Sequence, residues 1–158
     1  MTKMRRGFTM IELIFVIVII GILAVIALPK LTATRTDAKV SSIVANTKSV
    51  VNDVKNFYTS QGQSVYEGNA TVQDVTDVPL FASDCTTQLL TNKFVDQKAY
   101  ICGDDGKVVE FDPNTDKKKI TVKWVGTAGK DVDDYVKSNK AFRSLETTHR
   151  LGGLGIKQ

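Results

Sequence analysis

The N-terminal stretch of the chain constrains its fold more than any other feature. From Phe8 to Leu28 the sequence runs for 21 residues with a single charged side chain, Glu12. As an α-helix this stretch would be about 32 Å long at roughly 1.5 Å per residue. That length matches the hydrocarbon core of a bilayer, which is about 30 Å thick. We therefore predict a membrane-spanning helix, and the cations before it favour a cytoplasmic N-terminus: Lys3, Arg5 and Arg6.

Glu12 is the anomaly in this segment, because a bare carboxylate in a membrane costs about 2.5–3.5 kcal/mol on insertion scales. The segment contains no Lys, Arg or His that would pair with it. Cleavage after Gly7 would supply a partner, since Phe8 would then carry a free α-ammonium one helical turn before Glu12. The N-terminus of a helix also favours a carboxylate. We expect the two groups to pair within or between subunits. The alternative is an uncleaved anchor with Glu12 among the lipid headgroups.

The N-terminus resembles the class III signal of type IV pilins and type II secretion pseudopilins. The resemblance covers about the first 31 residues and rests on a basic leader, the stretch Gly7-Phe8-Thr9-Met10-Ile11-Glu12-Leu13, the apolar run, and Pro29-Lys30-Leu31. It implies cleavage after Gly7 and N-methylation of Phe8 by a membrane-embedded prepilin peptidase. It also implies a helix kink at Pro29 and assembly into a filament whose core is this helix.

A cleavable secretory signal is the alternative for the same residues, with Val25-Ile26-Ala27 as its cleavage region. It fits less well, because the apolar run exceeds the 7–15 residues that are usual in such a signal. It also gives Glu12 no role.

Charge and cysteine content indicate an exported chain. The formal net charge is +4, but the three leader cations supply +3, which leaves 18 basic (21 − 3) and 17 acidic side chains. The basic excess therefore indicates membrane topology, and we expect no specific nucleic-acid partner. Cys85 and Cys102 are the two cysteines. We predict that they form one disulfide, because the body of the chain faces an oxidising compartment.

The helical pattern continues past the membrane segment. Pro29 lacks an amide hydrogen and predicts a kink. Apolar residues then recur every three or four positions as far as Tyr58, the period of an amphipathic helix. Gly62 is the first C-terminal stop signal. We predict a cleaved leader over residues 1–7, one kinked helix over 8–61 whose first half is transmembrane, and a head over 62–158.

The head is expected to be a small antiparallel sheet that packs on the helix, so the fold class is α+β. Apolar or alternating runs between turn residues predict three strands: Ala99–Cys102, Lys107–Asp112 and Lys119–Val125. A helix is predicted from Asp131 to about Leu145, with a break at Ser138-Asn139.

The remaining parts of the head give less distinct signals. The polar stretch Gly62–Pro79 predicts a loop with short strands at Ser64–Tyr66 or Val72–Val75. Ser83-Asp84 predicts the N-cap of a short helix that runs to about Asn92. Residues 151–156 are expected to form either a mobile tail or a last edge strand.

The sequence offers one candidate metal site and no catalytic constellation. Asp112, Asn114 and Asp116 have the opening spacing of a calcium loop. The Gly and Glu expected at the sixth and twelfth positions are Lys117 and Lys123, so a turn is the better interpretation. The sequence has no phosphate-binding Gly loop, zinc set or nucleophile elbow. We expect neither enzymatic activity nor a cofactor.

These features predict a structural subunit of a pilus-like filament, held in the inner membrane with its head in the periplasm until assembly. The expected partners are copies of itself or other pilins and pseudopilins, the prepilin peptidase, the inner-membrane assembly platform and lipid. The alternative is a permanently anchored periplasmic binding module. The small head favours a secretion pseudopilin or minor pilin, whereas the disulfide is more typical of a type IV or competence pilin. Of these two systems, we favour the type II secretion pseudopilus.

Overall fold

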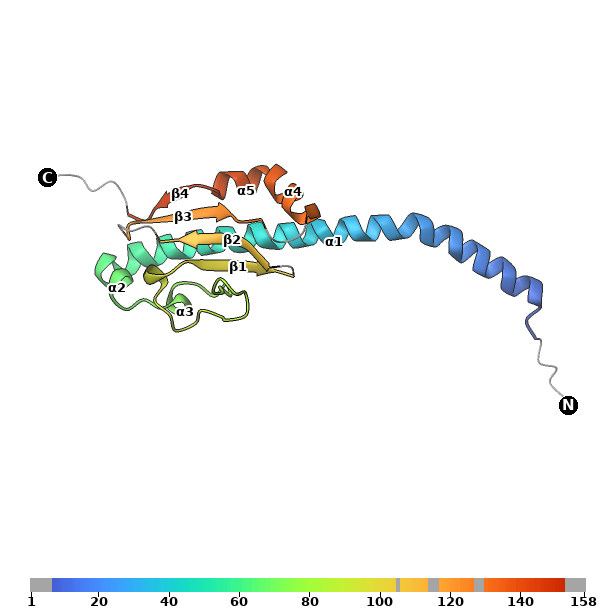
Figure 1. Cartoon of the computed structure of the whole chain (residues 1–158), viewed down its shortest axis with the longest axis horizontal. Coiled ribbons are helices and arrows are strands. Elements are labelled where there is room, and N and C mark those ends of the chain that lie inside the picture. Colours follow the sequence, from blue (N-terminus) through green and yellow to red (C-terminus); the bar gives the residue numbers. More distant parts are fainter. Residues whose placement is uncertain (1–6, 105, 114–116, 127–129, 153–158) are drawn as a thin grey trace. The chain divides into compact units, whose positions relative to one another are not determined.

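The structure is a computed structural model that describes residues 7–104, 106–113, 117–126 and 130–152, without the side chains of residues 28–33, 130 and 131. The chain divides into two units, Met1–Ala38 and Lys39–Gln158. Helix α1 (Met10–Gln61) contributes to both (Figure 1).

The first unit contains the apolar part of α1. All the described side chains of residues 8–27 are exposed. The segment Met10–Ala27 is long and apolar enough to cross a membrane by length and composition. The backbone of α1 is helical through Pro29. The kink predicted at Pro29 remains a prediction.

The second unit is a head that packs on the C-terminal half of α1. Fully buried side chains recur along one side of this half, as the amphipathic pattern predicted: Val40, Val50, Val51 and Val54. The helix ends at Gln61 because Gly62 takes a positive φ of 84°. The Gly62 amide donates a hydrogen bond to the Tyr58 carbonyl at 3.1 Å. The end predicted at Gly62 is confirmed.

The sheet of the head has four antiparallel strands in the order β1-β2-β3-β4. The strands are β1 (Ala99–Gly103), β2 (Gly106–Asp112), β3 (Lys119–Trp124) and β4 (Thr148–Arg150). The first three confirm the predicted meander. Its apolar side packs on α1 and contains Val109, Phe111, Ile120 and Val122, each at most 1% exposed. Figure 1 shows α1 lying along this sheet.

An edge strand that was not predicted, β4, lies directly before the tail expected at residues 151–156. Thr148, His149 and Arg150 lack the apolar alternation of a strand, so pairing with β3 alone defines β4. Leu151, where the tail was expected to begin, is buried, and its amide donates to the Lys118 carbonyl at 3.0 Å. Residues 153–158 lie outside the described part of the chain.

The predicted C-terminal helix and its break are confirmed as α4 (Lys130–Ser138) and α5 (Lys140–Leu145). The Asn139 side chain accepts hydrogen bonds from the amides of Ala141 and Phe142, so it caps α5 and separates the two helices. Phe142 then packs edge-on against Trp124 of β3, with ring centroids 5.6 Å apart.

The expectation of a loop or strands over residues 62–79 is wrong, because the structure forms α2 (Gln63–Gly68) and α3 (Val72–Val75) there. Tyr66 on α2 is fully buried against Tyr58 and Phe94, so tertiary packing holds this turn of helix. In α3, the Thr71 amide and hydroxyl both donate to the Asp74 carboxylate, at 3.0 and 2.6 Å. This capping box selects the helix.

The helix predicted from Ser83-Asp84 to Asn92 is also wrong. The Asp84 carboxylate accepts hydrogen bonds from the amides of Thr86 and Thr87 and from the Thr87 hydroxyl, and these bonds close a turn. They also lower the pKa of Asp84. The chain then doubles back, and the Leu89 amide donates to the Leu80 carbonyl at 2.8 Å. Pairing across the turn therefore replaces the i to i−4 bonds of a helix. A short 3-10 helix, η1 (Phe94–Asp96), leads into β1.

Candidate functional site

The start of α1 forms a compact polar site around Glu12. One oxygen of its carboxylate accepts hydrogen bonds from the Thr9 amide at 2.8 Å and from the Thr9 hydroxyl at 2.7 Å. In return, the Glu12 amide lies 3.3 Å from the Thr9 hydroxyl oxygen, to which it donates. Thr9 therefore occupies the N-cap position and Glu12 the third helical position of a capping box.

Thr9 was not predicted to belong to this site, although its sequence context contains the signal. Thr9-x-x-Glu12 immediately before an apolar run is the sequence pattern of a capping box. Within the single chain the Glu12 carboxylate already has two donors from Thr9, which offset part of the cost of moving it out of water.

The bond between Gly7 and Phe8 lies in an exposed stretch without regular secondary structure, directly before α1. Phe8 is 83% exposed. An exposed peptide bond outside a helix is accessible to a peptidase, whereas a helix would first have to unwind around the bond. In the uncleaved chain the Phe8 nitrogen is an amide, so its predicted pairing with Glu12 as an ammonium remains a prediction.

Cys85 and Cys102 are joined by a disulfide, with their Cα atoms 5.8 Å apart. The bond ties the turn that carries Asp84 to strand β1. Cys85 was predicted to lie on a short helix. In the structure the same crosslink instead anchors an irregular segment, which lacks the hydrogen-bond ladder of a helix or strand.

Of the three residues in the candidate calcium loop, the structure describes only Asp112. Its carboxylate lies 3.3 Å from the Lys98 ammonium, which also contacts Glu110 at 2.9 Å. Asn114 and Asp116 lie outside the described residues. Within the described residues, no group of three or more His, Cys, Asp or Glu side chains is placed to hold a metal ion. The calcium site remains an untested expectation.

The Lys98 ammonium stabilises a nearly buried carboxylate. Burial alone would raise the pKa of Glu110, but hydrogen bonds from Lys98 and from the Tyr100 hydroxyl lower it more, so the net shift is downward. The Tyr100 oxygen lies 3.1 Å from the second carboxylate oxygen. Both oxygens of Glu110 thus have donors, and the group is a structural ion pair of the sheet.

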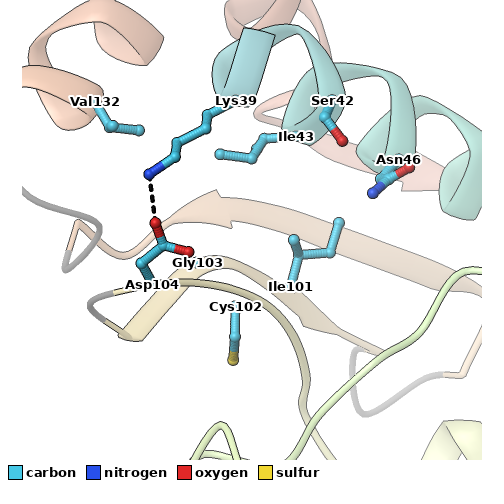
Figure 2. A pocket seen from close by; sticks show the side chains of 9 residues that line it. All are labelled: Lys39, Ser42, Ile43, Asn46, Ile101, Cys102, Gly103, Asp104 and Val132. Atoms are coloured by element: carbon cyan, nitrogen blue, oxygen red, sulfur yellow. Dashed lines mark hydrogen bonds and ion pairs between the residues drawn. The ribbon is translucent and has the colours of Figure 1, made fainter. Parts of the chain in front are cut away.

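The head also contains a pocket of about 220 Å³ between α1, the end of β1 and α4 (Figure 2). Its apolar walls are Ile43, Ile101 and Val132. Lys39 and Asp104 form an ion pair across one side of the pocket. The Cys102 sulfur points away from this space in Figure 2. The lining can therefore cover a small apolar group, but its charged side chains already neutralise each other.

Comparison with known proteins bears on the N-terminal site. Residues 2–28 match the family model of the prokaryotic N-terminal methylation motif. A fimbrial protein of Neisseria meningitidis serogroup B (strain ATCC BAA-335 / MC58) is 37% identical over 71 residues, which are 45% of this chain and 41% of that protein. The chain thus spans about two fifths of this relative. No solved structure matches significantly. The two matches support the resemblance to type IV pilins and pseudopilins.

Proposed function

We propose that this chain, which carries the N-terminal methylation motif of type IV pilins and pseudopilins, is a structural subunit of a pilus-like filament. The motif supports cleavage after Gly7 and methylation of Phe8 by a prepilin peptidase. The inner membrane would hold the subunit through Phe8–Leu28, with the head in the periplasm. An assembly platform would then move it into the filament.

One observation carries the proposal: Glu12 lies in an apolar segment whose described side chains are all exposed in the single chain. Lipid can cover such a segment in the membrane, and apolar helices of other subunits can cover it in a filament. The transfer costs little, because one apolar environment replaces another. Glu12 then determines the position that the helix takes in the filament, because its carboxylate can neutralise the ammonium of Phe8 on a neighbouring subunit.

Replacement of Glu12 tests the proposal. We expect Glu12→Ala to insert, to be cleaved after Gly7 and to retain the Cys85–Cys102 disulfide, but not to support filament assembly. A buried ammonium left without its partner costs several kcal/mol, and this cost recurs at every added subunit. The measurement is complementation of an assembly-deficient strain, with filaments and secretion scored separately.

Thr9→Val is the matched control. It keeps the β-branched shape and removes the hydroxyl that bonds to Glu12, while the carboxylate remains available to Phe8. We expect cleavage at Phe8 and filament formation, at a reduced yield. Mass spectrometry of the membrane-extracted variants should show methylated Phe8 as the N-terminus. Normal filaments from Glu12→Ala would contradict the proposed role of the carboxylate, and an intact Met1 on the mature wild type would contradict the processing.

A permanently anchored periplasmic binding module is the second candidate, and the pocket beside Ile43 and Ile101 is the observation that favours it. This candidate predicts no assembly defect in Glu12→Ala and slightly better retention in the membrane. The same complementation experiment therefore separates the two functions. The same experiment measures pili and secreted substrates separately. A loss of pili indicates a type IV or competence pilus, whereas a loss of secretion indicates a secretion pseudopilus.

A further inference from the structure

His149 joins three elements of the head through its two ring nitrogens. It lies on β4, where Nε2 is 2.9 Å from the Leu145 carbonyl oxygen at the end of α5. Nδ1 is 3.4 Å from the Lys55 ammonium nitrogen on α1. A carbonyl oxygen only accepts and an ammonium only donates. Nε2 must therefore carry the hydrogen and Nδ1 the lone pair, so the two contacts together require a neutral imidazole.

Protonation of the His149 ring would break one of these two contacts. The second ring hydrogen would sit on Nδ1 and point at the Lys55 ammonium, so two positive charges would meet at a distance where one hydrogen bond had joined them. The bond to Leu145 would survive, because Nε2 donates in both states. Protonation therefore acts on the link between β4 and α1.

The elements around His149 carry charged groups of both signs. On β3, Ile120 is opposite His149, and the neighbouring pair in the register is Lys119 with Arg150, both cationic. Two carboxylates on these elements accept hydrogen bonds from other groups: Glu146 from the Trp124 amide and Asp53 from the Thr76 hydroxyl. Arg143 on α5 adds a further cation, and its Nε donates to the Lys137 carbonyl.

We propose that His149 is a pH-sensitive latch for edge strand β4. When neutral, it holds the strand to α1 through Lys55; when protonated, it loses that link, and β4 opens more often. The strand is suited to such a response, because it has three residues and pairs with β3 on one side. The inference concerns the fold of the head and holds whether or not the chain assembles into a filament.

The chain offers a clean test, because His149 is its one histidine, and histidine is the side chain that ordinarily titrates between pH 5 and 8. The experiment is amide hydrogen exchange of the full chain in detergent at pH 7.5 and pH 5.0. The readout is a peptide covering residues 146–152. His149→Gln serves as reference at each pH, since a glutamine amide can donate to Leu145 and accept from Lys55 without taking up a proton.

At pH 7.5 we expect wild type and His149→Gln to exchange at similar rates. At pH 5.0 the wild type should exchange about tenfold faster than the reference, because one proton taken up on opening changes the equilibrium by up to roughly tenfold per pH unit. Peptides from β1 and β2 should show no such difference. Lys55→Met removes the opposing cation. The ratio of its exchange rate to that of His149→Gln should therefore be the same at pH 7.5 and at pH 5.0.

Two results would overturn the latch. The first is equal exchange of wild type and His149→Gln at pH 5.0. The second is an acid-induced acceleration in Lys55→Met as large as in wild type. If β4 already opens more often in His149→Gln at pH 7.5, Lys55→Met can be compared with wild type at the two pH values. This comparison still tests whether protonation acts through Lys55.

Discussion

Tyr66 shows how packing alone can hold a side chain in place. Its ring is fully buried, 5.4 Å from the Tyr58 ring and 6.3 Å from the Phe94 ring. Its hydroxyl has no hydrogen-bond partner in the part of the chain that the structure describes. Burial raises the pKa of this phenol, so it stays neutral at physiological pH. The ring therefore stabilises the head, while the buried hydroxyl opposes it.

We accordingly expect Tyr66→Phe to leave the free energy of unfolding unchanged or to raise it by up to about 3 kcal/mol, because an unsatisfied buried polar group costs about 1–3 kcal/mol. Tyr66→Ala should lower it by about 3–5 kcal/mol, as for other large-to-small aromatic replacements. Denaturant unfolding of the full chain in detergent measures both. A clear loss of stability in Tyr66→Phe would show that the hydroxyl has a partner.

At the scale of the elements, Gly62 both ends α1 and begins α2. Its backbone has φ 84° and ψ 164°, a region that essentially only glycine populates. The Gly62 amide donates to the Tyr58 carbonyl, and the Gly62 carbonyl accepts from the Tyr66 amide at 3.2 Å. The reversal of direction at this residue is what brings Tyr66 back onto the helix that precedes it.

Gly62→Ala should therefore lower the free energy of unfolding by about 1–3 kcal/mol, because a Cβ strains this backbone conformation. Space around the site is not the cause, since an added Cβ would meet nothing within 4 Å. Gly68→Ala is the matched control, as its Cβ is equally free and its φ is not positive. In that variant stability should stay constant or rise by up to about 1 kcal/mol. Equal effects at the two positions would rule out backbone strain at Gly62.

At the scale of the whole molecule, the disulfide compensates for missing regular structure. Residues 76–93 contain isolated bridges and turns, and helices and strands are absent from this described stretch. The segment is held by a few backbone bonds, including the reciprocal pair between Phe81 and Tyr100 of β1, each at 2.9 Å. The Cys85–Cys102 bond crosslinks it to the sheet, with 17 residues of sequence separation.

Replacing both cysteines by serine should lower the free energy of unfolding by roughly 3 kcal/mol, the value for closing a loop of about this length. The comparison is denaturant unfolding of the double variant and of the wild type in detergent, with reduced wild type as a second reference. Non-reducing peptide mapping of native material should show the Cys85–Cys102 peptide pair. Free thiols at both positions, or a stability difference close to zero, would contradict this role.

Local patterns in the sequence determined the long helix, its end at Gly62, the three-stranded meander and the break at Asn139. Each of these depends on a period of apolar residues or on one residue with a strong backbone preference, and such signals act over a few neighbouring positions. The N-terminal motif is of the same kind, because Gly7, Phe8 and Glu12 lie within six residues of each other. The Thr9–Glu12 capping box was equally readable.

Only the tertiary structure decided the elements whose local signals were ambiguous. α2 is helical because Tyr66 packs against aromatic rings of α1 and η1. Residues 80–89 double back instead of forming a helix because the Leu89 amide bonds to the Leu80 carbonyl. β4 is a strand because β3 offers it an edge. The contact of His149 with Lys55 spans 94 positions in the chain, and no local pattern encodes it. Packing and long-range hydrogen bonds set these features, since their energies arise only after distant segments meet.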